Sequence, residues 1–357
     1  MAMNTRKLTL LFTALVGLAA SAFAQSTPNE ATVARVTGTV TATLADGSTV
    51  SVTEGTKLPQ GATITTGDNS QAFLVSHGDT TSVIAANSVV EIAELSTTSA
   101  GGKVTEQKAT LDLKSGNLVA KLNPAKKSVN QYSVRTPKGV AAARGTVFTV
   151  QYKGGTYAIS VVNGVVTVIP PSNAGVIGTD LGVQVNAGQA MVASGNYGAQ
   201  WTAQTVTNEG NNSMSELGVD VRELLAVAVA TVTVAAQNNI GGTTAAEAAA
   251  VASAVFAAVP AAAEQAGAII AQSNAAKPPA DAAAAAAVLQ AVTTATPAAA
   301  QGAFTSGATT GTFTPNTQTT TTSPAPTNSN TNGNNGANPV TTPQPIDPAT
   351  VSRSGEE

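Results

Sequence analysis

The chain of 357 residues contains no cysteine, which excludes disulfides, thiolate metal sites and a cysteine nucleophile. Its single histidine, His77, rules out a multi-histidine metal centre or a two-histidine relay within one chain. Only 3% of the residues are aromatic and only 10% are charged, so Thr, Ser, Asn and Gln must cover much of the surface. The formal net charge of −3 predicts no general affinity for nucleic acid.

Motifs that hold phosphates, dinucleotides or calcium are missing as well. The sequence contains neither a phosphate-binding loop nor a dinucleotide-binding glycine pattern, and no calcium loop of alternating acids. Its many glycines indicate turns instead. We therefore expect no cofactor, no metal site and no catalytic residue.

A targeting segment begins the sequence. Arg6-Lys7 is a basic region, residues 8–20 are apolar, and Ala22-Phe23-Ala24 has the small-x-small pattern of a cleavage site. These features predict a signal peptide over residues 1–24, cleavage after Ala24, and an exported protein in the periplasm, at the cell surface or outside the cell. The alternative is an uncleaved anchor, which would be the protein's one contact with a membrane.

Residues 31–204 have the character of β-strands throughout. Short runs of Val, Thr, Ile and Leu alternate with glycine-containing turns, as half-buried strands require. Asp46-Gly47 is the strongest hairpin signal. Further turns are expected at Glu54-Gly55, Gln60-Gly61, 67–69, 77–79, 115–117, Gly154-Gly155 and Asn163-Gly164. We expect an all-β domain, solenoid-like or sandwich-like.

Three segments of this region, 36–40, 113–118 and 162–166, each place a glycine between apolar runs. The spacings between the glycines differ, so the segments do not form a fixed-period array. They predict a coiled β architecture in which similar turns recur at one edge.

Alanine-rich helices are expected over residues 213–304. Capping-box spacing occurs at 213–216 and at 244–247, and a third helical run covers 281–292. Alanine favours helices but has little apolar surface to bury, which predicts close helix contacts or weak packing on the β domain. Residues 305–357 are rich in Thr, Pro, Asn, Gly and Ser, a composition that predicts a disordered tail.

Two groups of residues are weighed as catalytic sites. Ser76-His77-Gly78-Asp79 contains a Ser/His/Asp trio, but consecutive residues in a turn point apart, so we expect a solvated hairpin turn. Glu91 with Glu94, or Asp68 with Asp79, could serve a glycosidase. Such a cleft usually has aromatic platforms, and Trp201 is the only tryptophan, so an exposed strand face is the favoured interpretation.

Charge is distributed unevenly. Residues 30–94 carry seven acids and two bases, whereas residues 103–153 carry ten bases and two acids. The basic segment 103–153 could dock an unknown protein partner or an anionic cell-surface polymer. The alternative, which we favour, is edge-strand lysines that discourage aggregation. Arg144 differs from these lysines because it lies in an apolar stretch, where a guanidinium normally pairs with a carboxylate.

Residues 134–150, VRTPKGVAAARGTVFTV, predict a strand, a tight corner at Pro137 and a second strand. Together with earlier and later motifs, this segment resembles the FecR domain, the extracytoplasmic domain of iron-dicitrate-type regulators. The resemblance covers residues 31–194 and rests on the order of segments 36–40, 54–58, 60–67, 70–74, 111–119, 136–148, 161–168 and 185–190.

The resemblance implies a β-rich fold outside the cytoplasm, with Pro137, Arg144, Gly145, Thr146 and Phe148 as fold-defining residues rather than a binding site. In the founding regulators the domain relays receptor signals to a sigma factor. This sequence shows no cytoplasmic helical domain ahead of a membrane span. We therefore expect a non-enzymatic, exported FecR-domain protein that binds or supports structure in the envelope. The alternatives are an envelope sensor related to anti-sigma regulators and a polysaccharide-active enzyme.

Overall fold

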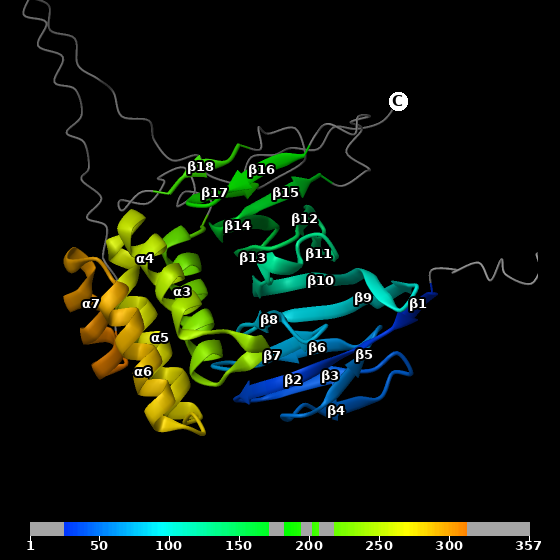
Figure 1. Cartoon of the computed structure of the whole chain (residues 1–357), viewed down its shortest axis with the longest axis horizontal. Helices are drawn as coiled ribbons and strands as arrows, with labels where there is room; N and C mark the ends of the chain where they lie inside the picture. Colours follow the sequence, from blue (N-terminus) through cyan, green and yellow to red (C-terminus); the bar gives the residue numbers. More distant parts are fainter. Residues whose placement is uncertain (1–24, 171–181, 194–201, 207–217, 313–357) are drawn as a thin grey trace, which may run out of the picture. The chain divides into compact units, whose positions relative to one another are not determined.

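A computed structural model describes residues 25–170, 182–193, 202–206 and 218–312. Strands lie between Gln25 and Thr205, and helices lie between Val221 and Thr310 (Figure 1). All described residues fall in one compact unit. The predicted cleavage site at Ala24, Trp201 and the tail beyond residue 312 lie outside the described residues.

The strands form two sheets, and β10 takes part in both. We call the first one the open sheet; its order is β4 (Thr49–Ser51), β3 (Val40–Thr43), β6 (Thr63–Thr66), β9 (Val89–Ala100), β10 (Lys103–Lys121), β11 (Asn130–Thr136), β12 (Gly139–Ala143), β15 (Val165–Ile169) and β16 (Val183–Asn186). Strand β1 (Gln25–Pro28) adds to β9. All these pairs are antiparallel except β10 with β11.

The second sheet, which we call the covered sheet, has the order β5 (Lys57–Pro59), β2 (Glu30–Thr37), β7 (Gln71–Ser76), β8 (Thr80–Ile84), β10, β13 (Val147–Lys153), β14 (Thr156–Asn163), β17 (Gln189–Ala193) and β18 (Gln204–Thr205). One apolar core joins the inner faces of both sheets; it includes Leu58, Ile64, Ile92, Phe148 and Val166. The predicted all-β domain is therefore confirmed, in its sandwich-like form.

The three repeated glycine segments mark places where the chain passes from one sheet to the other. Gly38, Gly116 and Gly164 all have positive φ angles, of 70°, 97° and 83°. A Cβ at Gly38 would overlap Ser70, and one at Gly116 would overlap Ser88. Glycine is required at these corners because both the backbone angle and the available space exclude a side chain. The expected turn at 115–117 is wrong in one respect: β10 bends there but continues as a strand.

Helices cover the outer face of the covered sheet. Helix α3 (Val221–Gln237) lies next to β13 and β14 (Figure 1). Phe73, Val83 and Val119 point outward from the covered sheet and belong to the same apolar cluster as the buried residues of α3. The central strands of this sheet are therefore buried on both faces, and of the two expected alternatives, close helix contacts or weak packing on the β domain, the second does not hold.

The described residues form five α-helices, where the sequence predicted three. Helix α3 begins at the N-cap Asp220 rather than at the spacing over 213–216, which lies outside the described residues. The capping box of Thr244 and Glu247 is confirmed at the start of α4 (Ala245–Ala258), but Pro260 separates α4 from α5 (Ala263–Ala276). Two further helices follow, α6 (Ala282–Ala295) and α7 (Ala298–Thr310). Helix α7 extends beyond residue 304, where the tail was expected to begin. None of the helices in the described ranges is long and apolar enough to span a bilayer.

Polar contacts supplement the apolar contact between helices and sheet. Arg35, on β2, is only 2% exposed; it donates to Asn238 Oδ1 at 3.1 Å, to Ser273 O at 3.1 Å and to Lys277 O. The pKa of Arg35 is lowered by burial, an effect that the nearby Glu54 opposes. The guanidinium therefore joins β2 to the C-terminal ends of α3 and α5.

Candidate functional site

The segment over residues 134–150 adopts the predicted strand, corner and strand. Strands β11 and β12 pair antiparallel on either side of the exposed Pro137, and β13 follows. Thr146 and Phe148 are buried, and the Phe148 ring meets Tyr132 edge-on at 6.1 Å between centroids. A Cβ at Gly145 would lie 2.8 Å from the Cα of Pro124, so this position requires glycine.

Arg144 differs from the other members of this motif. Its side chain is exposed and forms no ion pair with any described residue. The expected carboxylate partner is therefore absent from the described parts of the chain. Lys127 is also exposed and lies beside Gly145, the residue after Arg144; a Cβ at Gly145 would be 3.4 Å from the Cβ of Lys127. Arg144 and Lys127, two exposed bases with no salt bridge to any described residue, are therefore carried by neighbouring segments of the chain.

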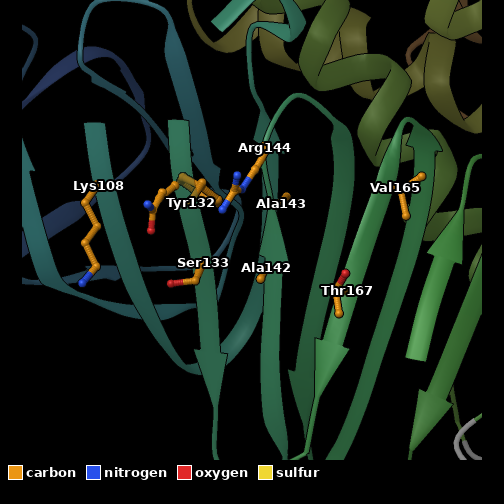
Figure 2. A pocket seen from close by; sticks show the side chains of 9 residues that line it. Lys108, Tyr132, Ser133, Ala142, Ala143, Arg144, Val165 and Thr167 are labelled. Atoms are coloured by element: carbon orange, nitrogen blue, oxygen red, sulfur yellow. The ribbon is translucent and has the colours of Figure 1, made fainter. Parts of the chain in front are cut away.

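Arg144 borders a shallow groove on the outer face of the open sheet, with a volume of about 440 Å³. Figure 2 shows Lys108, Ser133, Ala142 and Thr167 side by side on successive strands, with Arg144 at one end. The strand register explains the arrangement, because Ser133 lies opposite Ala142 and Ala142 opposite Thr167. The small side chain of Ala142 leaves a depression between larger neighbours on both sides.

The groove has both polar and apolar lining residues. Ser133 and Thr167 supply hydroxyl groups. Val165 is 44% exposed at its border. The sequence predictions did not single out the groove residues other than the bases. The alternation of residues along each strand predicts which side chains face outward. It does not predict which strands lie side by side, because strand order depends on long-range pairing.

Salt bridges within the described part of the chain pair at least five of the ten bases of the segment 103–153. Three of them bind acids of the preceding acidic segment: Lys108 with Glu94 at 3.0 Å, Lys114 with Glu91 at 2.8 Å and Lys126 with Asp79 at 3.0 Å. The other two pairs are Arg135 with Asp112 and Lys121 with Glu247. Intramolecular ion pairs therefore neutralise part of the charge contrast between the two segments. These five bases pair with acids of the same chain, so they are not explained as edge-strand lysines that discourage aggregation.

The candidate catalytic acids take part in the same pairs. Glu91 and Glu94 form their ion pairs across β9 and β10, Asp79 also accepts from Asn123 Nδ2 at 3.0 Å, and Asp68 is exposed. Residues that could hold a metal ion do not cluster in groups of three anywhere in the described ranges. A convergent pair of carboxylates in a cleft, as glycoside hydrolysis requires, is not formed by these four acids.

His77 lies in the hairpin between β7 and β8, as predicted, but it is not solvated. Its Nε2 lies 3.1 Å from Lys108 O, so this nitrogen carries the proton that it donates to the carbonyl. Its Nδ1 then accepts from Asn29 Nδ2 at 3.2 Å or from Thr97 Oγ1 at 3.3 Å. Burial lowers the pKa of His77, an effect partly opposed by the Lys108 carbonyl and by Asp79. Within the described residues, neither Ser76 nor Asp79 is hydrogen-bonded to the ring.

Fold and site together define a class of protein: a two-sheet β domain with one face covered by helices and a shallow groove on the other. Residues 62–167 match the model of the family described as FecR protein. Residues 62–167 therefore contain a FecR domain, as the order of the motifs predicted. The match lies inside the β region and includes β11, β12 and β13.

Solved structures offer a weaker comparison. Two crystal structures of a candidate anti-sigma factor from Parabacteroides distasonis ATCC 8503, at 1.65 and 2.50 Å resolution, align at 14% identity with a TM-score of 0.31. The alignment covers 40% of this chain and 59% of the other protein. A TM-score this low carries no argument about fold or function. No curated protein matches the chain.

Proposed function

We propose that this chain is an exported, non-enzymatic FecR-domain protein whose open sheet binds an anionic partner in the groove beside Arg144. The observation that carries the proposal is the pair of exposed cations, Lys127 and Arg144, without a salt-bridge partner in the described chain. The five neighbouring bases that lie against acids are already neutralised. A carboxylate-bearing polymer of the cell envelope matches this charge, and Ser133 and Thr167 offer hydroxyls for its polar groups.

Export is supported first by the N-terminal sequence. The basic, apolar and small-x-small segments up to Ala24 have the order of a cleavable signal peptide. The FecR-domain family points in the same direction, because the domain is extracytoplasmic in the regulators. N-terminal sequencing of the protein from native cells tests this part of the proposal: a chain that starts at Gln25 supports it.

A second candidate function is an envelope sensor related to anti-sigma regulators, favoured by the FecR-domain match. It would require the apolar residues 8–20 to remain as a tether. The two functions separate in cell fractionation: a sensor stays with the inner membrane, whereas a cleaved protein appears in the periplasm, at the surface or in the medium.

An enzyme acting on polysaccharides is the least supported function. Asp79 and Glu91, the acids that it would use, are engaged in ion pairs. If the chain were such an enzyme, purified protein would degrade envelope polysaccharide and the Glu91→Gln or Asp79→Asn variant would lose this turnover. We expect no turnover in any of the three proteins.

Binding to poly-glutamate, with uncharged dextran as the neutral probe, tests the groove. The whole exported chain is needed, because the β domain alone would expose the apolar face that the helices cover. We expect binding to poly-glutamate that weakens at high salt, and a loss of about tenfold in the double variant Lys127→Gln/Arg144→Gln.

The matched control is Lys103→Gln, because Lys103 is an exposed base at the start of β10, beside the turn at 101–102 and away from the groove. It should leave the affinity unchanged. Equal losses in the control and in the double variant would mean that the attraction is general and that the groove has no special part in it.

A further inference from the structure

The first strand of the described chain is attached to the sandwich in an unusual way. Strand β1 pairs antiparallel with residues 96–99 of β9, yet all four of its residues are exposed. It contributes backbone hydrogen bonds and one side-chain bond, from Thr27 Oγ1 to Thr97 O at 3.3 Å. Because β1 buries no side chain, its removal would cost no part of the apolar core.

A single residue connects β1 to the rest of the fold. Asn29 separates β1, in the open sheet, from β2, which begins at Glu30 in the covered sheet. The next residues, Ala31 and Val33, are buried and hold β2 in place. Any movement of β1 therefore pivots at Asn29.

The pivot is held by a small polar cluster. The Asn29 backbone N–H donates to Leu95 O at 2.8 Å, and its side-chain amide lies 2.5 Å from Thr97 Oγ1 and 3.2 Å from His77 Nδ1. His77 is fixed in turn by its bond to Lys108 O. These contacts act on residue 29 itself and leave residues 25–28 held by strand pairing.

Release of β1 would expose an unpaired edge. Residues 96–99 of β9 would stay paired with β10, but their backbone groups that face β1 would lose their partners, and such an edge can pair with another extended chain. The strand that fits this edge in register is β1 itself, so the matching strand of a second copy fits it equally well. Exchange of an identical element between two copies is an economical route to a dimer, because it uses contacts that already exist.

We propose that β1 exchanges between two copies of this protein, so that residues 25–28 of each chain pair with residues 96–99 of the other. Asn29 is the hinge of the exchange, and the contacts of Asn29 with His77 and Thr97 favour the closed, unexchanged form. The exchanged dimer keeps both sheets and the helical cover of each copy intact. The groove beside Arg144 plays no part in the exchange.

The absence of cysteine makes a direct test available. Ser26 and Thr98 are register partners in the β1–β9 pair. Two full-length variants, Ser26→Cys and Thr98→Cys, each carry one thiol, and neither can form a disulfide within its own chain. When the two are mixed and oxidised, we expect a covalent dimer in which mass spectrometry of peptides identifies a bond between positions 26 and 98.

Two controls keep the result decisive. The double variant Ser26→Cys/Thr98→Cys should form the same bond within one chain at low protein concentration, which shows that both thiols can react there. A mixture of Ser51→Cys and Thr98→Cys should give no specific dimer, because Ser51 is an exposed residue of β4 that pairs with Thr41.

The Asn29→Ala variant should increase the yield of the 26–98 dimer severalfold, because it removes the side-chain contacts of the hinge. Deletion of residues 25–28 should abolish any dimer seen by light scattering. The proposal is overturned if the double variant closes within one chain while the mixed single variants never form the 26–98 bond. Binding to poly-glutamate does not enter these readouts, so the two proposals fail independently.

Discussion

Strands of similar sequence lie in different environments in the two sheets. Strand β8 (TTSVI), in the covered sheet, is buried at every residue, whereas β15 (VVTVI), in the open sheet, alternates between exposed and buried. The polar residue Thr81 therefore lies under the helical region, next to Gly241, although its side chain would also suit a solvated face. Small hydroxyl side chains are compatible with either a buried or a solvent-exposed face. The face of the covered sheet is buried because the alanine-rich helices pack on it.

The largest expected difference between the two faces comes from removing an apolar side chain. Phe73 is fully buried between the covered sheet and the helices. Replacing it by alanine should lower the free energy of unfolding by about 3–5 kcal/mol. Val165→Ala, on the outer face of the open sheet, should change it by less than about 0.5 kcal/mol. Urea unfolding of both variants measures the contrast. Similar costs would mean that the helices do not seal the covered sheet.

Two arginines offer a second contrast between the same faces. Arg35→Ala removes the donor to Asn238 Oδ1, Ser273 O and Lys277 O, and we expect a loss of about 3 kcal/mol. Arg135→Ala removes an exposed pair with Asp112 on the open sheet, and the expected loss is at most about 1 kcal/mol. The denaturant midpoints of the two variants measure these losses of stability. A larger loss in Arg135→Ala than in Arg35→Ala would contradict the expected contrast.

A glycine at a corner between the sheets should matter more than one in a hairpin. Gly116 and Gly102 both have positive φ angles, of 97° and 74°, but a Cβ at Gly116 would overlap Ser88, whereas one at Gly102 would meet nothing within 4 Å. Gly116→Ala should therefore cost about 1–3 kcal/mol more than Gly102→Ala. Thermal unfolding checks this, and equal shifts would show that backbone angle alone accounts for the glycine.

The smallest expected effect concerns pH. Since burial lowers the pKa of His77 in the folded chain, the unfolded chain takes up the proton first as the pH falls through the ordinary histidine range. The stability that neutral His77 contributes is present at neutral pH and declines on acidification. The stability difference between the native chain and the His77→Gln variant should therefore shrink from neutral to mildly acidic pH. A difference that stays constant with pH would contradict this account.

Local sequence patterns predicted the strands, the hairpin at Asp46-Gly47 and the capping box at Thr244, because each depends on neighbouring residues. They also identified the corner glycines Gly38, Gly116 and Gly164, although the partners of those glycines are far away in sequence. The patterns left open whether the helices pack on the β domain, and they missed the break at Pro260. Helix packing here depends on many small contacts of alanine, which leave little amphipathic signal.

The candidate site was predictable only in part. Arg144 stood out from the sequence, but its exposure and the closeness of Lys127 did not. The closeness of Lys127 comes from the packing of residues 124–127 against Gly145, a contact that local patterns do not reveal. Likewise, the basic segment was visible as a run of charge, whereas its pairing with Glu91, Glu94 and Asp79 required the fold. The net charge of this segment in the sequence is therefore larger than the charge that remains unpaired on the surface of the fold.

The central claim is that helices seal the outer face of the covered sheet, while the outer face of the open sheet remains exposed to solvent. Thiol labelling of two single-cysteine variants tests it most directly, since the native chain has no cysteine. Val119 is 1% exposed and faces the helices, and Val165 is 44% exposed on the open sheet. We predict rapid labelling of Val165→Cys and labelling of Val119→Cys only on unfolding. Equally rapid labelling of both in the folded protein would contradict the account.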